Sequence, residues 1–179
     1  MANIRIGTRA SELAVWQAKK VQEKLKEINV SSSIVQISSS GDKDLSKPIY
    51  ELGITGVFTK EIDVALINKE VDIAVHSLKD VPTVLPKGVI QSAVLKRGTE
   101  KDILIINKEL QESNNTIATG SLRRKAQWLN KYKSDNIIPI RGNVVTRLKK
   151  LKESNWTGTI MAKAGLERLN LIPVNYMDL

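Results

Sequence analysis

Short apolar runs alternate along this chain with amphipathic stretches at helical spacing, and this pattern limits it to a small set of folds. In the first half, an apolar run begins at Ile4, and Ser11 is placed to cap a helix whose apolar residues continue to Ile28. The compact run Val71–Val75 is typical of a buried strand. The strands expected in this half are 4–8, 33–38, 71–75 and 89–95, with helices after Ser11 and after Phe58.

The same alternation returns after Leu95–Asp102, a polar and charged stretch that we interpret as the connection between two units. There Ser121 and Asn143 are placed to cap helices that reach Tyr132 and Glu153. The strands expected in this half are 102–106, 116–119, 136–140 and 159–162, with a short helix from Gly165. Strands alternating with helices predict an α/β fold with largely parallel sheets, here as two lobes, residues 1–95 and 96–179. The apolar end, 171–179, is typical of a chain that stops before its next element.

Composition excludes several classes of site. The 179 residues include no cysteine and one histidine, so a disulfide framework, a thiolate metal site, a cysteine nucleophile and a histidine-cluster metal site are all excluded within this chain. The first 30 residues lack an apolar core of the signal-peptide type, and no later run approaches the roughly 20 apolar residues of a membrane span. A cytoplasmic protein is the expectation.

Positive charge is concentrated in one part of the chain. Residues 116–168 hold 12 Lys and Arg against 3 Asp and Glu, which is the whole net charge of +9. A localised basic field attracts anions, whether nucleic acid, acidic lipid, or a small polycarboxylate or phosphate. The alternative is a solvated basic face.

Arginines recur at or near the strand–helix junctions, where parallel α/β sheets bind their ligands. These residues are Arg9, Arg123, Arg124, Arg141, Arg147 and Arg168. An arginine in the first turn of a helix is unfavourable, because its charge meets the positive end of the helix dipole. Several of them together indicate a bound anion that offsets this cost, and the arginine fork suits carboxylate or phosphate. The alternative for each arginine is a surface ion pair.

A second candidate is Lys79-Asp80, which follows the expected strand Val71–Val75. A carboxylate among arginines stays ionised, so it is a poor general acid but can stabilise a developing cation. The alternative is an aspartate in a turn before Pro82. His76 is interpreted as a structural residue at the strand end.

Motifs of matching order and spacing run through most of the chain. They are IGTRASELAVWQA at 6–18, GD at 41–42, GVFTKE at 56–61, DIAVHSLKDVP at 72–82, ATGSLRR at 118–124, IRGNV at 140–144, TRL at 146–148 and AGLERL at 164–169. In this combination the chain resembles the N-terminal two domains of the porphobilinogen deaminase (hydroxymethylbilane synthase) family.

The resemblance implies a transferase of tetrapyrrole and haem biosynthesis. Such enzymes join four porphobilinogen molecules into linear hydroxymethylbilane and release ammonia at each step. It implies two lobes like those of periplasmic binding proteins, facing each other across a cleft that holds a dipyrromethane cofactor. In the family a thioether anchors that cofactor to a cysteine of a third domain. It also implies porphobilinogen as the small-molecule partner, no nucleic acid or membrane partner, and a monomer.

By matching position, the resemblance implies that Asp80 is the catalytic residue, stabilising pyrrole N–H groups and the cationic azafulvene formed on deamination. Phe58 would pack near the pyrrole rings. The residues implied to hold the acetate and propionate groups are Arg9, Ser11, Lys79, Ser121, Arg123, Arg124, Arg141, Arg147 and Arg168. No metal is implied.

The chain departs from the family pattern at three positions and at its end. Thr55 stands where a lysine is common, Gly120 where a serine is common, and Lys163 where a small apolar residue is usual. We expect Lys163 to replace part of the charge lost at Thr55. The chain stops before the family's third domain, so we expect the 179 residues alone to be inactive.

Two other functions are open at this stage. The first is a small polycarboxylate or anion-binding module without catalysis, which the binding-protein architecture would allow. The second is a nucleic-acid binder, which the basic half permits. Aromatic residues make up only 4% of the chain, however, and single-strand binding relies on exposed aromatic platforms.

Overall fold

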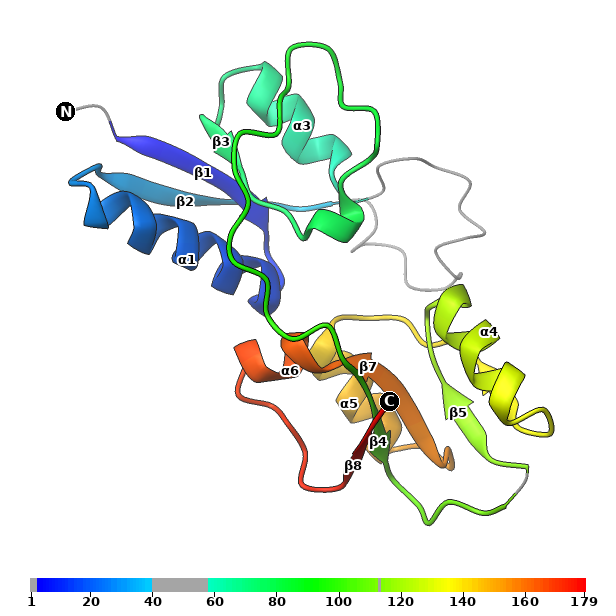
Figure 1. Ribbon diagram of the computed structural model, residues 1–179. Coiled ribbons are helices and arrows are strands. Elements are labelled where there is room, and N and C mark those ends of the chain that lie inside the picture. Colours follow the sequence, from blue (N-terminus) through cyan, green and yellow to red (C-terminus); the bar gives the residue numbers. More distant parts are fainter. Residues whose placement is uncertain (1–2, 40–57, 113) are drawn as a thin grey trace. The chain divides into compact units, whose positions relative to one another are not determined.

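The computed structural model describes residues 3–39, 58–112 and 114–179 (Figure 1). The described residues form two compact units, and the chain passes from the first to the second between Lys96 and Arg97. We call them unit 1 and unit 2. Each unit has its own sheet and its own helices, and each is described by itself below.

Unit 1 is built on a parallel three-stranded sheet in the order β2-β1-β3. Its elements are β1 (Ile4–Arg9), α1 (Glu12–Glu27), β2 (Ser32–Ile37), α3 (Lys60–Ile67), β3 (Ile73–Ala74) and the 3-10 turn η2 (Leu78–Asp80). Helix α1 packs along β1 and β2, and α3 packs along β1 and β3. Strand β1 ends two residues before Ser11, and β3 ends shortly before η2. Because β1 and β3 are parallel neighbours, these two motif segments leave the sheet at the same edge.

Close packing explains a glycine in the middle of β1. A Cβ atom on Gly7 would lie 2.9 Å from Cγ2 of Val71 and 3.3 Å from Cγ2 of Ile62, so a larger residue would push the chain at Val71 and α3 away from the sheet. Ile6 and Ile62 are fully buried on either side of this contact. Gly7 therefore allows the sheet and α3 to approach each other.

The expected strand at 71–75 is shorter than predicted, and the expected strand at 89–95 is wrong. Only Ile73–Ala74 is regular strand, although the Asp72 and Val75 amides continue the pairing by donating to the carbonyls of Arg5 and Gly7. Residues 89–95 form no regular element. Ile90 and Val94 are 81% and 66% exposed, so an apolar run here has no neighbouring strand or core among the described residues.

Unit 2 contains a five-stranded sheet in the order β6-β5-β7-β4-β8. Its elements are β4 (Asp102–Ile106), β5 (Thr116–Ala118), α4 (Leu122–Lys131), β6 (Asn136–Ile138), α5 (Val144–Lys152), β7 (Gly158–Ala162), α6 (Lys163–Arg168) and β8 (Tyr176–Asp178). Strand β5 pairs in parallel with β6 and β7, whereas β4 runs antiparallel to β7 and β8. The largely parallel α/β architecture is confirmed, with β4 as an antiparallel addition.

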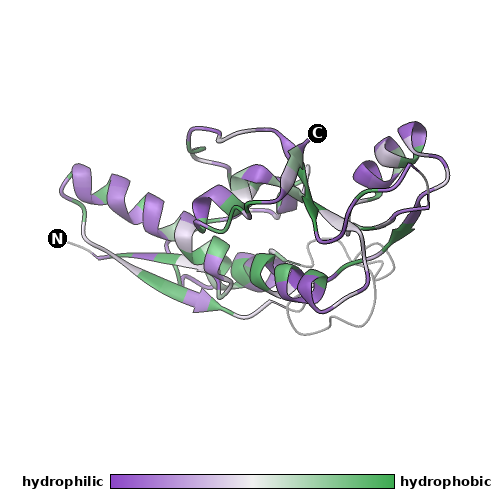
Figure 2. Ribbon diagram, turned by 90° about the horizontal axis from the view of Figure 1, so that it is seen from below, coloured by the Kyte–Doolittle hydropathy of each residue, from purple (hydrophilic) through white to green (hydrophobic). Residues whose placement is uncertain are grey.

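The unit 2 sheet is covered on both faces. Alternate residues of a strand point to opposite faces, and β4 shows this: Ile103 and Ile105 join one buried cluster and Leu104 joins another. The first cluster includes Leu151 of α5, and the second includes Trp128 of α4. Figure 2 shows hydrophobic stretches on the strands and mixed hydrophilic and hydrophobic residues along the helices. Helices α5 and α4 thus cover opposite faces of the sheet.

An ion pair ties the start of β1 to the chain before β3, and we expect it to make stability depend on pH. Arg5 donates two side-chain hydrogen bonds to Asp72, from Nη2 to Oδ1 at 2.8 Å and from Nε to Oδ2 at 3.0 Å. The hydrogen bond from the Arg5 side chain, followed by that from the Arg5 amide, lowers the pKa of Asp72 from 3.8 to about 2. Because the folded pKa is depressed, the stabilisation is fully present above about pH 5 and is lost as the pH falls through the folded pKa of about 2.

Urea unfolding at a series of pH values tests this expectation. The variant Asp72→Asn should be slightly less stable than the parent protein at neutral pH, because both partners are partly exposed and screened by solvent. The difference between the two proteins should shrink toward pH 2. A difference that stays constant down to that pH would show that the Asp72 charge contributes nothing.

None of the helices in the described part of the chain has the length and apolarity of a membrane-spanning segment.

Candidate functional site

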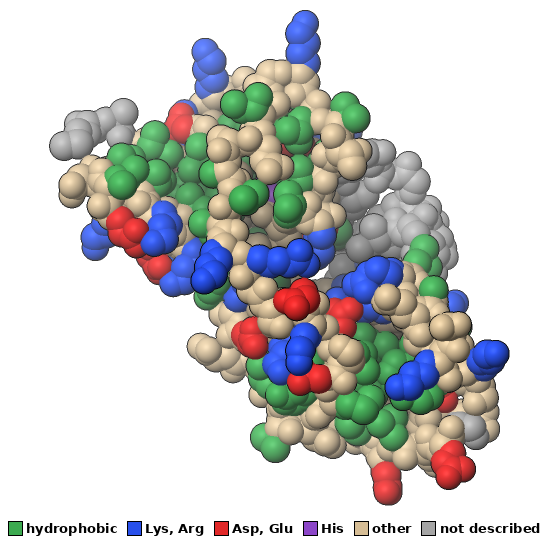
Figure 3. Space-filling view, viewed as in Figure 1, with side chains coloured by type: hydrophobic (Ala, Val, Ile, Leu, Met, Phe, Trp, Pro, Cys, Tyr) green, Lys and Arg blue, Asp and Glu red, His purple; other side chains and the backbone are tan. Residues whose placement is uncertain are grey.

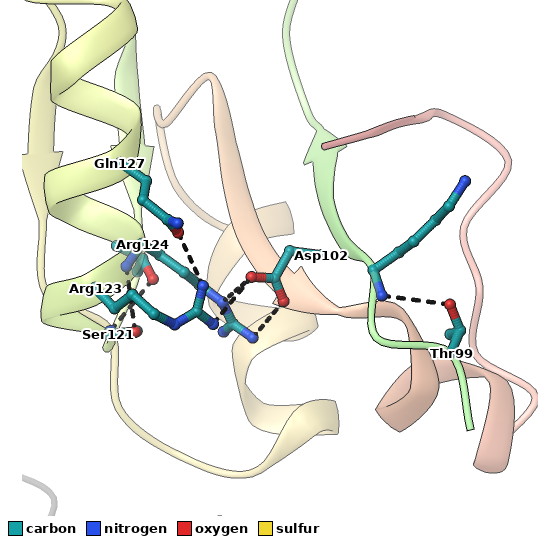
Figure 4. Close-up of polar contacts among 8 residues, drawn as sticks. Thr99, Asp102, Ser121, Arg123, Arg124 and Gln127 are labelled. Carbon is teal, nitrogen blue, oxygen red and sulfur yellow. Dashed lines mark hydrogen bonds and ion pairs between the residues drawn. The ribbon is translucent and has the colours of Figure 1, made fainter. Parts of the chain in front are cut away.

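Ser121 places two of the candidate arginines at the start of helix α4. Its side-chain oxygen accepts a hydrogen bond from the Arg124 amide at 3.4 Å, which confirms the predicted N-cap. Arg123 and Arg124 consequently occupy the first turn, where their charge opposes the helix dipole. Figure 4 shows both side chains directed toward Asp102 at the start of β4.

Asp102 supplies the negative charge that these arginines require. Its Oδ1 accepts from Nη2 of Arg124 at 2.7 Å, and its Oδ2 accepts from Nε of Arg124 at 3.0 Å and from Nη2 of Arg123 at 3.3 Å. The side chains of Arg124 and Asp102 are 15% and 16% exposed, whereas that of Arg123 is 63% exposed. For Arg124, the offsetting charge that we attributed to a bound anion comes from the chain itself.

A group of guanidinium side chains lies beside this ion pair. Burial lowers the pKa of Arg147, and the positive charges of Arg124 and Arg141 lower it further. Asn143 caps α5 by accepting from the Thr146 amide at 2.8 Å, which sets Arg147 in the first turn. Nε of Arg147 donates to the Gly142 carbonyl at 2.8 Å. The positive charges of Arg141 and Arg124 near Arg147 favour the binding of an anion beside it.

Arg141 is brought to this group by the end of β6. It follows the strand by three residues, the whole residue is 7% exposed, and its carbonyl accepts from Nζ of Lys150 at 3.3 Å. We call Arg123, Arg124, Arg141 and Arg147 the arginine group of unit 2.

Gly120 lies between the arginine group and the end of β6. A Cβ atom on Gly120 would lie 2.7 Å from the Ile140 carbonyl oxygen and 3.6 Å from Nη2 of Arg147. Backbone cannot move aside as a flexible side chain does, so any larger residue must shift the Ile140–Arg141 peptide. Glycine at position 120 thus allows the chain before α4 to lie close to the Ile140 backbone.

We expect Gly120→Ser to displace Arg141 and to destabilise unit 2 by about 1–3 kcal/mol, the usual cost of forcing extra volume into a packed position. Thermal unfolding measures the loss of stability. A serine variant as stable as the parent protein would show that the Ile140 carbonyl is free to move.

Arg168 lies apart from the strand–helix junctions that the sequence pattern suggested. It is the last residue of α6, where a positive charge is favourable to the helix dipole. A Cβ atom on Gly98 would lie 3.5 Å from its Nη2, so the guanidinium reaches the chain just before β4. Its position therefore has a structural explanation independent of any ligand.

In unit 1, Asp80 ends the turn η2 that follows β3. Its side chain is 15% exposed, and Oδ1 accepts from Nζ of the adjacent Lys79 at 2.8 Å. Lys79 itself is 78% exposed. The carboxylate is thus largely shielded from solvent while its counter-charge lies at the surface.

His76 is a shielded neighbour of this carboxylate. Its side chain is 11% exposed, with Nε2 at 4.0 Å from Oδ1 of Asp63. Burial lowers the pKa of His76 and the Arg9 charge acts in the same direction, while Asp63 and Asp80 oppose the change. The imidazole is therefore neutral near pH 7, which suits the structural role inferred from the sequence.

Arg9 and Phe58 contact each other at the end of β1. The Arg9 guanidinium carbon lies 4.1 Å from the centre of the Phe58 ring, an attractive cation–π arrangement. Ser11 stands at the N-cap of α1, but its side chain makes no capping hydrogen bond to the described helix. The hydroxyl is thus not committed to the role that the sequence suggested.

The structure therefore divides the candidate residues between the two units. Unit 1 holds Arg9, Ser11, Phe58, Lys79 and Asp80, and unit 2 holds Ser121, Arg168 and the arginine group. Thr55 lies outside the described residues. Lys163 donates to Oδ1 of Asp178 at 2.9 Å, and its suggested replacement of a charge lost at Thr55 stays a prediction. Figure 3 shows lysine and arginine side chains on both units, with fewer acidic ones among them.

Comparison with known proteins gives one consistent result. The profile of the family described as "Porphobilinogen deaminase, dipyromethane cofactor binding domain" matches residues 4–178. A probable porphobilinogen deaminase of Methanocaldococcus jannaschii is 45% identical over 171 residues, covering 94% of this chain and 58% of the relative. A chloroplastic porphobilinogen deaminase of Oryza sativa subsp. japonica is 46% identical over 178 residues, covering 94% of this chain and 50% of the relative.

The chain thus spans 50–58% of the length of these two curated relatives. Among solved structures, an ancestral cationic amino acid solute binding protein superposes with a TM-score of 0.56 at 12% identity, covering 99% of this chain and 76% of the other. At this identity the likeness concerns the fold alone, and it agrees with the expected periplasmic-binding-protein type.

Proposed function

Because the chain belongs to the porphobilinogen deaminase family, we propose that this protein acts as a hydroxymethylbilane synthase, joining four porphobilinogen molecules with release of ammonia. The observation that supports the proposal is the arginine group of unit 2, in which the partly buried Arg147 donates from Nε to the Gly142 carbonyl and lies near the positive charges of Arg124 and Arg141. Porphobilinogen and its products carry acetate and propionate groups. Their carboxylates are the anions that such a group favours.

The proposal assigns carboxylate binding to positive and hydroxyl side chains, each considered within its own unit. These residues are Arg9, Ser11, Lys79, Ser121, Arg123, Arg124, Arg141, Arg147 and Arg168. Phe58, held by Arg9, offers an apolar ring for a pyrrole. Each charge-assisted hydrogen bond contributes about 1.5–3 kcal/mol, so several together bind a dicarboxylate far more strongly than a single contact.

Asp80 is assigned the catalytic role. Its carboxylate is mostly shielded from solvent, so its charge acts on a neighbouring cation with less screening than at the surface. Loss of ammonia from porphobilinogen leaves a positive charge shared with the pyrrole nitrogen. Asp80 would accept the pyrrole N–H and stabilise that charge, while the neutral His76 adds no competing cation.

The family's dipyrromethane cofactor fits the residues present. The arginine group offers several guanidinium donors to a group that carries four carboxylates, and an anion would offset the positive charge of Arg124 and Arg141 near Arg147. When bound, the cofactor supplies the chain end to which pyrroles are added. The residues that would hold it are Ser121, Arg123, Arg124, Arg141 and Arg147. This chain contains no cysteine to anchor it.

Porphobilinogen binding by the 179-residue chain tests the proposal. Isothermal titration should give a dissociation constant that Arg147→Gln raises at least about tenfold, since one charge-assisted contact is lost. Lys152→Gln, the matched control, removes the same charge from the last turn of the same helix. It should change the constant by no more than about twofold, as expected for an exposed charge.

Two results would contradict the proposed function. One is an equal effect of the Arg147 and Lys152 variants, which would indicate general attraction to a basic surface. The other is binding of acetate or sulfate as tight as that of porphobilinogen, which would favour the small-anion module. The cytoplasmic location stays a prediction, since one relative is chloroplastic. The monomeric state also stays a prediction.

A further inference from the structure

Asp102 occupies one particular edge of the Arg124 guanidinium. The carboxylate accepts from Nε and Nη2, the two nitrogens that form a parallel fork, at 3.0 and 2.7 Å (Figure 4). This is the bidentate geometry in which arginine also binds ligand carboxylates. The edge of Arg124 that is best suited to a ligand is thus already filled by the chain.

The remaining donors are distributed unevenly. A guanidinium has five N–H groups, and Asp102 takes two of those of Arg124, leaving three. Arg123 gives Nη2 to Asp102 at the longer distance of 3.3 Å and Nη1 to Gln127 at 2.8 Å. It is also far more exposed than Arg124. A ligand would therefore find its donors on Arg123, on Arg147 and on the outer nitrogens of Arg124.

Asp102 also changes the charge that a ligand meets. Without it, Arg123 and Arg124 would present two uncompensated charges in a helical first turn, next to the buried Arg141 and the partly buried Arg147. Such a site would attract any small anion. With Asp102 present, the site carries one unit less of positive charge, and the Nε–Nη2 fork of Arg124 is closed to a ligand.

We propose that Asp102 is a specificity-determining residue, a built-in counter-carboxylate that excludes small anions from the Nε–Nη2 fork of Arg124 and holds that arginine in place. Ligand carboxylates are then confined to the donors that Asp102 leaves. The inference rests on the proposed function only for the identity of the natural ligand. Any carboxylate can be used to test whether the Nε–Nη2 fork of Arg124 is open to a ligand.

Propionate, which carries no pyrrole, is the probe. Titration of the 179-residue chain should show that Asp102→Asn binds propionate at least about fivefold more tightly than the parent protein, since a nearby negative charge is removed and a fork is released. Glu153→Gln is the matched control. It adds the same unit of charge to unit 2, from an exposed pair with Lys149, and should leave propionate affinity within about twofold.

A folded Asp102→Asn protein that binds propionate no more tightly than the parent would overturn the proposal, because a purely structural aspartate predicts unchanged or weaker binding.

A second measurement avoids the variant altogether. In the parent protein, the NMR signal of the Arg124 Nε–H should stay in place as propionate is added, while side-chain signals of Arg123 or Arg147 shift. A shift led by the Arg124 Nε–H would mean that the ligand displaces Asp102, which also overturns it. Neither readout requires turnover, so each is distinguishable from failure of the proposed function.

Discussion

Replacing Asp80 by asparagine is expected to lower the rate of hydroxymethylbilane formation by at least about 10²-fold, the usual loss when one electrostatic contact to a developing charge is removed. Asparagine has nearly the same shape but carries no charge, so it cannot offset the cation left when ammonia departs. The fold should be retained, because Asp80 lies in a short turn and its side-chain partner, Lys79, is at the surface. The rate is measured in a chimera in which residues 4–178 replace the matching part of the Methanocaldococcus jannaschii relative.

Asp72→Asn is the matched control for this experiment. It makes the same chemical change in the same unit, in an ion pair with Arg5 away from the candidate site. It should leave kcat within about twofold, as expected for a partly exposed structural pair. Equal rates for the Asp80 variant and the parent chimera would remove Asp80 from the mechanism.

The second large effect concerns the 179 residues tested by themselves, which we expect to show no sustained turnover. The chain has no cysteine, so it cannot hold the dipyrromethane cofactor through a thioether. A tethered group acts at an effective concentration of millimolar or more, and well-oriented groups can reach about 10⁵ M or higher. A cofactor bound only by arginine–carboxylate contacts loses that advantage at every addition.

The measurement is incubation of the purified chain with porphobilinogen, with and without free dipyrromethane, followed by assay of hydroxymethylbilane. Sustained product formation without a primer or a second polypeptide would show that covalent anchoring is unnecessary.

Local interactions explain which parts of the structure could be predicted from the sequence. Ser121 and Asn143 cap their helices through residues three positions away, so the signal and the structure lie in the same short segment. The repeated strand–helix alternation likewise predicted a largely parallel sheet, and β5 pairs in parallel with β6 and β7. Such features depend on spacing that a single sequence displays.

Contacts between distant segments could not be predicted in this way. The cost of placing Arg124 in a first helical turn was attributed to a bound anion, whereas the structure shows the alternative, an ion pair with Asp102. Nothing in the spacing pointed to this residue, which lies on a strand 22 residues earlier. The apolar run 89–95 failed as a strand for the same reason, since a strand requires a partner that the run itself does not reveal. Arg168 was assigned to a strand–helix junction because it follows β7 by a few residues, whereas in the structure it is the last residue of α6.

Turnover by the chimera defined above shows whether the residues of this chain perform the family's chemistry. We expect the purified chimera to convert porphobilinogen to hydroxymethylbilane, with four molecules of ammonia released for each product. We expect Arg147→Gln to impair this conversion and Lys152→Gln to leave it unchanged. A chimera that is folded and carries the dipyrromethane cofactor, yet forms no hydroxymethylbilane, would rule out the proposed activity.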